Sequence, residues 1–446
     1  MTDAEAVAAF DPWRPGPRPR VVHRVPVRSR ALTAPLHDVP SSAPEVLGPV
    51  EGSAGTQVWV RFLHFAPDAR AVALAPSGWW NPDPVDALDL HPVGGTGWFV
   101  AEVAAPADWI AGYRFAEYRG RADPPWWTTG LKRLEHPDVR MSADCANPRR
   151  LTVKGGARTS LICVSAINAA AHPVLDLFLT PESWPEHVQV HRLGDDTGGP
   201  IGPPGKGPGD MDGGPAVWWW AASSAGTRET PLIVFFDGEA HVRNHDTPRF
   251  LAAAVEAGLL PPVAAVFVES GPNRAQVLGV PGGRAQWVAR TLVPRLLNTG
   301  LESLGTGRVR ISRDPLQRIV TGSSFGGLST LFTLATDPGA CGTGIVQSPS
   351  LWRYPEGDFA ELLARALARG AVPKSQRKPG GTSARMRLRL AAGRFEGNAV
   401  ARCAGLHAEL GGLGLEVGPA VTAVSGGHDW SWWIPHSIAQ AAELLR

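Results

Sequence analysis

The sequence predicts two folded domains: a small β-sandwich, followed by a larger domain in which helices cover both faces of a mainly parallel sheet. The first prediction rests on several short alternating runs, separated by Pro- and Gly-rich turns, before residue 150. The second rests on apolar strand-like runs that alternate with helix-like segments from Ala216 onward. We therefore expect a flexible tail at 1–40, a β-sandwich domain at 41–150 and an α/β domain at 151–446.

Composition narrows the class of protein. The chain has 446 residues, of which 43% are hydrophobic and 19% charged, as in soluble globular proteins. Its net charge of +2 and the lack of a large basic block argue against a nucleic-acid partner. We find no secretory signal and no run of about 18 apolar residues, which predicts a cytoplasmic protein with no membrane partner. The four cysteines lie far apart, so neither a zinc site nor a disulfide framework is expected.

The N-terminal half is expected to be rich in strands. Residues 1–40 are rich in Pro and Arg without a hydrophobic period, hence the predicted tail. Strand-like runs follow at 58–63, 71–74, 98–103, 110–117, 161–165 and 174–179. Residues 194–214 are dense in Gly, Pro and Asp, which predicts a surface loop or linker.

The C-terminal half is expected to alternate between strands and helices. The expected strands are 217–221, 232–236, 263–268, 318–321, 344–346, 386–390 and 421–424. The expected helices are 250–257, 287–297, 359–367 and 399–410, with one more beginning near Phe325. Parallel sheets carry their chemistry at the carboxyl ends of their strands, so we look for functional side chains there.

One such end carries Gly322-Ser323-Ser324-Phe325-Gly326, a Gly-x-Ser-x-Gly sequence between a β-like run and a helix-like pattern. This is the nucleophile elbow of a serine hydrolase with the α/β-hydrolase fold. A tight strand-to-helix turn pushes the Ser324 hydroxyl clear of the sheet, and the two glycines let neighbouring backbone approach closely. The free N–H groups of the following helix point at the place where negative charge develops.

A serine hydroxyl is a poor nucleophile until a base takes its proton. In this fold the order along the chain is Ser, acid, His. His428 follows the last expected strand on a Gly-rich loop, and Glu396 follows the strand before it. We predict Ser324, Glu396 and His428 as a catalytic triad in which the carboxylate holds the imidazole tautomer. Asp429 is a rival acid, but a sequence neighbour rarely faces its own His ring well.

The oxyanion hole needs two backbone N–H groups. We assign one to Phe325, next to the nucleophile, and the other to Gly238, in the loop after the strand at 232–236. His241 and His245 share an i, i+4 spacing that suits a metal site, but no third ligand is evident. The proposed chemistry needs no cofactor.

Five segments occur in the order found in the enterochelin esterase family, and together with an N-terminal segment they carry a resemblance to it. They are 236–239, 322–328, 348–352, 392–396 and 426–430, and the N-terminal segment is 107–115. The resemblance implies an immunoglobulin-like N-terminal domain and cytoplasmic hydrolysis of the ester bonds of a ferric catecholate siderophore, an enterobactin-like trilactone. It also implies that Arg274 faces the anionic ligand. Trp352 and Trp430 could stack on the aromatic rings of this ligand, and packing is the alternative role for both. Iron would enter with the substrate.

Two other functions fit the same motifs. One is a general carboxylesterase or acyltransferase of the same fold that acts on another acyl ester. The other is a catalytically inactive homologue that binds a ligand through its Trp-rich surface.

Overall fold

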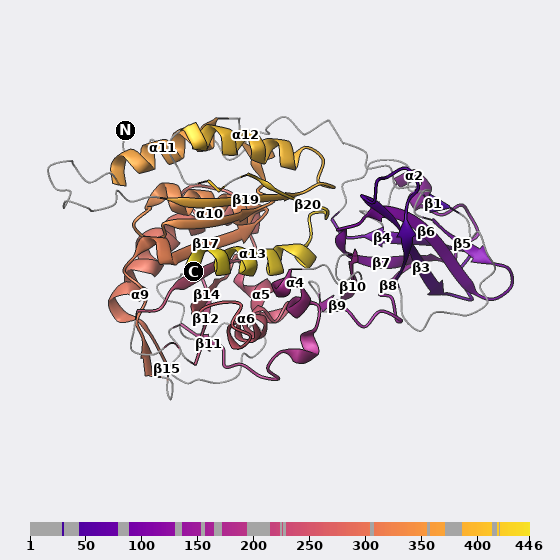
Figure 1. Ribbon diagram of the computed structural model, residues 1–446, viewed down its shortest axis with the longest axis horizontal. Helices are drawn as coiled ribbons and strands as arrows, with labels where there is room; N and C mark the ends of the chain where they lie inside the picture. The colour runs from indigo at the N-terminus through magenta and orange to yellow at the C-terminus, as the bar shows by residue number, and fades with distance from the viewer. Residues whose placement is uncertain are drawn as a thin grey trace.

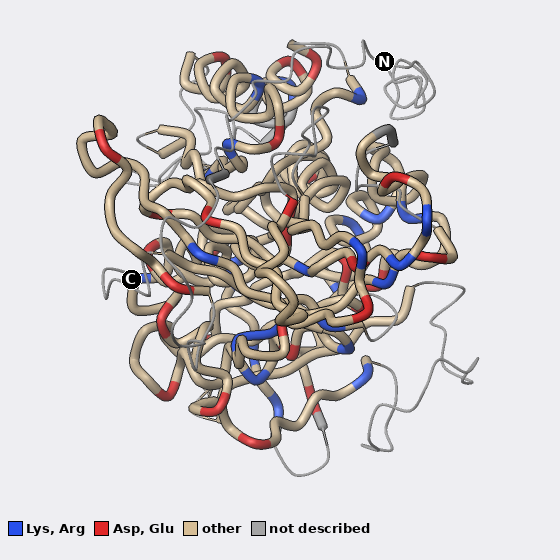
Figure 2. Tube along the Cα trace, turned by 90° about the vertical axis from the view of Figure 1, so that its right-hand side faces the viewer, with Lys and Arg blue, Asp and Glu red and all other residues tan. Residues whose placement is uncertain are grey.

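The computed structural model describes two β-rich parts of the chain, the N-terminal one in indigo and violet in Figure 1. The described residues are 29–30, 44–78, 89–129, 136–152, 157–164, 172–193, 215–223, 225, 229–303, 307–354, 357–370, 386–412, 417–418 and 420–446. Most of the predicted tail and the predicted loop at 194–214 lie outside them. Along the described chain, basic and acidic positions are interspersed (Figure 2). None of the helices in this part is long and apolar enough to cross a membrane.

The N-terminal part is an antiparallel sheet system of order β2-β3-β6-β5-β4-β7-β10-β9, with β1 on β6 and β8 on β7. Its strands are β1 Ser29–Arg30, β2 Glu45–Pro49, β3 Gln57–Phe65, β4 Ala71–Pro76, β5 Asp89–Val93, β6 Trp98–Pro106, β7 Ile110–Tyr118, β8 Val139–Ser142, β9 Arg150–Thr152 and β10 Arg158–Cys163, with one short helix, α2 Trp126–Thr129. Alternate side chains of these strands enclose a core that includes Phe62, Trp109 and Phe115. An immunoglobulin-like sandwich remains a prediction for this β-rich region.

Two boundaries differ from the prediction. The strand β1 belongs to the predicted tail, yet it pairs with β6 at Ser29–Val103. A strand of this length is held by backbone hydrogen bonds. Such bonds need no hydrophobic pattern, so the sequence did not predict the strand. The N-terminal sheet also runs past residue 150, because β10 pairs with β7 and places Ile162 in the N-terminal core.

The C-terminal part is built on an eight-stranded sheet of order β11-β12-β14-β13-β17-β18-β19-β20. The strands from β14 to β20 run parallel, while β11 and β12 pair antiparallel at one edge. Their bounds are β11 His191–Arg192, β12 Val217–Ala221, β13 Leu232–Phe236, β14 Ala264–Val268, β17 Arg318–Ser323, β18 Thr343–Gln347, β19 Arg387–Gly393 and β20 Thr422–Val424, with a separate pair β15 Leu301–Ser303 and β16 Gly307–Val309. The predicted α/β architecture is confirmed for this part.

Helices cover both faces of this sheet (Figure 1). They are α4 Pro173–Phe178, α5 Gly238–Arg243, α6 Thr247–Glu256, α7 Arg274–Leu278, α8 Arg284–Trp287, α9 Val293–Thr299, α10 Phe325–Thr336, α11 Asp358–Gly370, α12 Ala399–Gly412 and α13 Trp430–Leu445, with a π-helical segment at Val288–Leu292 and 3-10 turns at Pro181–Ser183, Pro315–Gln317 and Leu351–Arg353. The strand β13 shows how two cores arise: Val234 joins the core under α7–α12, and Phe235 joins the core under α4, α6 and α13. Successive strand residues face opposite sides, so an all-apolar strand is buried on both faces.

The predicted strand at 174–179 is wrong, since the segment forms helix α4. Pro173 occupies its first turn, and His172 caps it by accepting a hydrogen bond from the Val174 N–H at 3.2 Å. Apolar side chains at Val174 and Phe178 are buried one helical turn apart, a spacing that fits a helix better than a strand.

Arg318, at the start of β17, is 2% exposed and donates to three carbonyl groups: Ala340 at 2.5 Å, Ser312 at 2.6 Å and Gly339. We expect Arg318→Met to lower the free energy of unfolding by about 3 kcal/mol, since three carbonyl oxygens lose their donor. Urea unfolding measures this. Arg313→Met is the control, because the Arg313 side chain is 83% exposed and its loss should cost under about 0.5 kcal/mol. Equal losses in both variants would contradict the prediction.

Candidate active site

Ser324 lies at the turn between β17 and α10 with φ +59° and ψ −117°. A non-glycine residue held in this region stores about 1–3 kcal/mol of strain, which the surroundings must offset. Those surroundings are close: a Cβ atom at position 322 would lie 2.5 Å from the carbonyl of Gly326. The Ser324 N–H donates to the Gln347 carbonyl at 3.0 Å, and the Ser350 N–H donates to the Ser324 carbonyl at 3.1 Å. The turn is therefore fixed on both sides, as a nucleophile elbow requires.

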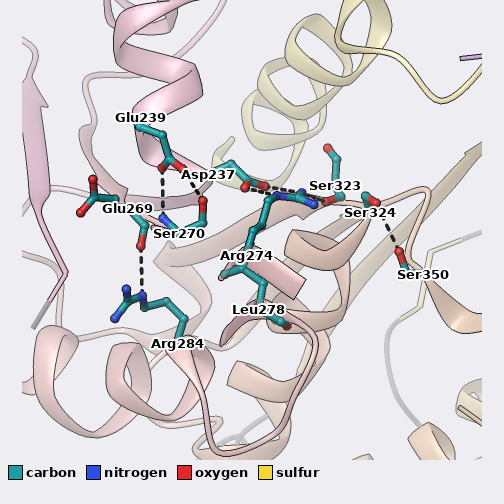
Figure 3. Close-up of polar contacts among 11 residues, drawn as sticks. Asp237, Glu239, Glu269, Ser270, Arg274, Leu278, Arg284, Ser323, Ser324 and Ser350 are labelled. Atoms are coloured by element: carbon teal, nitrogen blue, oxygen red, sulfur yellow. Dashed lines mark hydrogen bonds and ion pairs between the residues drawn. The ribbon is translucent and has the colours of Figure 1, made fainter. Parts of the chain in front are cut away.

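The Ser324 hydroxyl lies 3.2 Å from the Ser350 hydroxyl (Figure 3). The next residue, Phe325, begins α10. Gly238 begins α5, the helix that follows β13, and β13 is the strand next to β17. The N–H groups that open a helix have no acceptor inside the helix. Gly238 packs tightly against the sheet, since a Cβ there would lie 2.4 Å from the Phe267 carbonyl carbon. Both predicted oxyanion residues thus begin helices at one edge of the sheet.

Glu396 and His428 meet at the same edge, on the loops after β19 and β20. The His428 Nδ1 atom lies 2.7 Å from Glu396 Oε2. The Glu396 side chain is fully buried, and its Oε1 atom accepts from the Gly393 N–H at 2.8 Å and from the Ser348 hydroxyl at 2.6 Å. Three donors around one buried carboxylate fix its direction, so the imidazole is held in one orientation.

Two residues with no predicted role, Ser348 and Trp433, pack around this pair. The Trp433 indole N–H donates to Ser348 Oγ at 3.0 Å, and its ring meets the His428 ring edge-on at 4.7 Å. Ser348 follows β18, the strand next to β17. Ser348 and Ser350 lie in the segment 348–352 that contributed to the family resemblance, so the sequence marked them without giving their contacts. Trp433 had no signal of its own, because it lies in α13, a helix missing from the sequence prediction.

Arg274 forms a two-bond ion pair with Asp237, through Nε to Oδ1 and through Nη2 to Oδ2 at 2.7 Å (Figure 3). Burial lowers the pKa of Arg274, but the Asp237 carboxylate outweighs it and raises the pKa overall. The guanidinium also lies 5.6 Å above the centre of the Phe325 ring. Its charge is thus compensated within the protein, which favours a bracing role beside the elbow over direct capture of an anionic ligand.

The two predicted aromatic platforms are both partly buried. Trp352 meets Phe325 edge-on, with ring centres 6.1 Å apart, so it lies near the elbow. The Trp430 ring packs against the rings of His245 and Trp433, with ring centres 4.7 Å and 5.3 Å apart. Trp430 therefore contributes to packing around α5 and α13, and Trp352 is the better placed of the two for contact with a ligand.

His241 and His245, the pair with metal-like spacing, are both buried. His241 Nδ1 lies 2.9 Å from the Thr247 hydroxyl. Within the described ranges, no group of three or more His, Cys, Asp and Glu side chains could hold a metal ion. The pair is thus explained by packing under Trp430.

This pair makes stability depend on pH. Burial lowers the pKa of both His241 and His245 from 6.5 to about 3. Between these values the unfolded chain binds protons that the folded chain does not, so stability falls as the pH drops below about 6.5. When the pH falls from 7.5 to 5.5, we expect the free energy of unfolding to decrease by about 1 kcal/mol for each of the two histidines. In His245→Leu, the difference in unfolding free energy between the two pH values should be smaller by the contribution of one histidine. Urea unfolding at both pH values measures this.

The matched control is His187→Leu, which makes the same substitution at a side chain that is 90% exposed. An unaltered pH difference in His245→Leu would contradict the assignment.

Part of the chain is similar to known esterases. Residues 219–399 match the family described as "Putative esterase". The chain is 28% identical over 211 residues to the iron(III) enterobactin esterase of Dickeya dadantii (46% of this chain, 45% of that protein). It is 26% identical over 209 residues to the iron(III) salmochelin esterase of Escherichia coli O6:H1 (45% of this chain, 47% of that protein). The resemblance to the enterochelin esterase family is confirmed. The matched region spans about half the length of each of these relatives.

Solved structures of enterochelin-type esterases share the fold. The enterobactin esterase of Shigella flexneri, crystallised in the presence of enterobactin, superposes with a TM-score of 0.64 at 20% identity, covering 90% of this chain and 95% of that one. The ferric enterobactin esterase of Salmonella typhimurium gives a TM-score of 0.64 at 20% identity, covering 91% of this chain and 96% of that one. The fold of both parts of this chain is therefore shared with these solved structures.

Proposed function

We propose that this chain is a serine esterase that hydrolyses the ester bonds of a ferric catecholate siderophore and so releases its iron. The observation that carries the proposal is the hydrogen-bonded pair of the buried Glu396 and the partly buried His428, on the same sheet edge as the strained Ser324 turn. A ligand-binding protein has no need of such an arrangement, whereas acyl transfer does. The names of the relatives favour a siderophore ester as the substrate.

The proposed reaction uses Ser324, His428 and Glu396. Ser324 Oγ attacks the ester carbonyl carbon while His428 takes the hydroxyl proton. Glu396 faces Nδ1, which leaves Nε2 as the base, and the carboxylate stabilises the imidazolium. The carbon–oxygen bond to the leaving alcohol then breaks, and the alcohol takes the proton from His428. Water, deprotonated by His428 in turn, attacks the acyl-enzyme, and the carboxylic acid leaves with Ser324 restored.

The N–H groups of Phe325 and Gly238 form the proposed oxyanion hole. They open α10 and α5 on neighbouring strands, so both point toward the edge where the tetrahedral oxygen would lie. Trp352 is the proposed contact for an aromatic ring of the substrate. Arg274 and Trp430 support the site by holding Asp237 and His245 in place.

The test is a substrate comparison. Purified protein is incubated with a tris-catecholate trilactone, with and without Fe³⁺, and with an aryl acetate, and the products are resolved by liquid chromatography and mass spectrometry. Ring-opened catechoyl-serine products, formed with a higher kcat/KM than acetate, are expected. Cleavage of acetate alone would support a general carboxylesterase instead, a possibility that the broad family match favours. Failure to cleave any ester, with trilactone binding detected by calorimetry, would overturn the enzymatic proposal.

A further inference from the structure

The loop that carries His428 lies between the two parts of the chain. We define residues 425–429 as the histidine loop. From the N-terminal part, the Ile110 N–H donates to the Ser425 carbonyl at 3.0 Å, and the Gly78 carbonyl accepts from the His428 N–H at 2.9 Å. The Gly112 N–H donates to Asp429 Oδ2 at 2.5 Å. Three hydrogen bonds thus join β7 and the turn after β4 to a loop of five residues.

Asp429 is the side chain through which part of this contact is made. It is 5% exposed, and its Oδ2 atom accepts from Gly112 and also from the Ser431 hydroxyl at 2.7 Å. Burial raises the pKa of Asp429, while the hydrogen bonds from Ser431 and Gly112 oppose the rise. Two donors from different elements hold this buried acceptor, so the Asp429 side chain is fixed in one position.

The contact leaves no free space. A Cβ atom at position 78 would lie 2.4 Å from the His428 carbonyl oxygen, and one at position 112 would lie 3.0 Å from Asp429 Oδ2. The opposite side of the loop is held too, since the Phe395 N–H donates to the Gly426 carbonyl at 3.1 Å and the Trp432 indole donates to the Gly427 carbonyl at 2.6 Å.

We propose that the N-terminal part is a positioning element of the active site, which sets the His428 imidazole through Gly78, Gly112 and Asp429. The inference rests on the proposed esterase function. The C-terminal part supplies the groups that react, and the N-terminal part fixes the distance between His428 and Ser324. Gly112 and Asp429 act through His428 and do not touch the reacting atoms. Displacement of a catalytic group by about 1 Å can lower a rate about 100-fold, so small changes at this contact have measurable effects.

Gly112→Ala tests the proposal, because its Cβ meets Asp429 Oδ2 without a backbone conformation that disfavours alanine. Gly94→Ala is the matched control in the same part of the chain, where an added Cβ meets nothing within 4 Å. We measure the rate of fluorophosphonate labelling of Ser324 against pH, kcat and KM for an ester, and thermal unfolding. Gly112→Ala should lower the labelling rate and kcat about 10-fold, with KM within about twofold and a shifted pH profile. Gly94→Ala should match the unaltered protein.

Asp429 provides a second pair of variants. Asp429→Asn keeps an oxygen that can accept from both Gly112 and Ser431, so it should retain most of the kcat. Asp429→Ala removes that oxygen and should lose about 10-fold or more. Equal losses in the two variants would show that the charge matters and not the contact, which would overturn the proposal.

The outcomes separate the two levels of inference. Labelling of Ser324 at equal rates in the unaltered protein and in Gly112→Ala would overturn the positioning role and leave the esterase intact. An unaltered protein that is folded but never labelled would overturn the proposed function, and the positioning role with it.

Discussion

Ser324→Ala is expected to lower kcat for ester hydrolysis by about 10⁶-fold and to abolish covalent labelling by a fluorophosphonate. The reason is chemical, since alanine offers no oxygen to attack the carbonyl carbon or the phosphorus. The fold should persist, because alanine occupies the same backbone conformation and the hydrogen bonds to Gln347 and Ser350 are made by the main chain. Intact-protein mass spectrometry after labelling, together with initial rates, measures both effects.

The matched control is Ser323→Ala. Ser323 precedes the proposed nucleophile. Its hydroxyl donates to Gln347 Oε1 at 3.0 Å, and the residue is 4% exposed, so the Ser323 side chain faces the interior. This variant should still give one adduct per chain, and peptide mapping should place it on Ser324. An adduct that persists in Ser324→Ala would show that another group is the nucleophile.

Local patterns were enough to predict which loops carry the proposed triad. The elbow is encoded within five residues, and its glycines are required by the close approach of Gly322 to Gly326. Glu396 and His428 could be selected because consecutive parallel strands bring their carboxyl ends to one edge. The structure places these two side chains 2.7 Å apart, while their catalytic roles remain predictions.

Contacts between distant side chains could not be predicted in this way. The Arg274–Asp237 ion pair joins residues 37 positions apart, and the Gly112–Asp429 hydrogen bond joins residues 317 positions apart. Such contacts depend on how finished elements pack, and periodicity carries no information about them. The same limit explains β10: its sequence reads correctly as a strand, but only the three-dimensional pairing with β7 assigns it to the N-terminal sheet.

Glu396→Gln is expected to lower kcat by about 10⁴-fold while the protein stays folded. Glu396 accepts three hydrogen bonds, from Gly393 and Ser348 on Oε1 and from His428 on Oε2. A glutamine oxygen can replace Oε1, which leaves its NH₂ group facing His428 Nδ1. That nitrogen must then accept a hydrogen bond, so the proton moves to Nε2 and the imidazole can no longer take the proton of Ser324. The substitution thus keeps the shape of the site and reverses the tautomer.

Steady-state rates and the pH dependence of labelling measure this. Glu409→Gln, on an exposed position of α12, is the control and should leave kcat unchanged. If the carboxylate acts as predicted, Glu396→Gln should change kcat far more than KM, since the tautomer affects the attack and not the binding of the ester. A variant that kept more than about a tenth of the kcat would show that Glu396 does not orient His428. The acid would then have to be sought at Asp429, the other carboxylate beside this histidine.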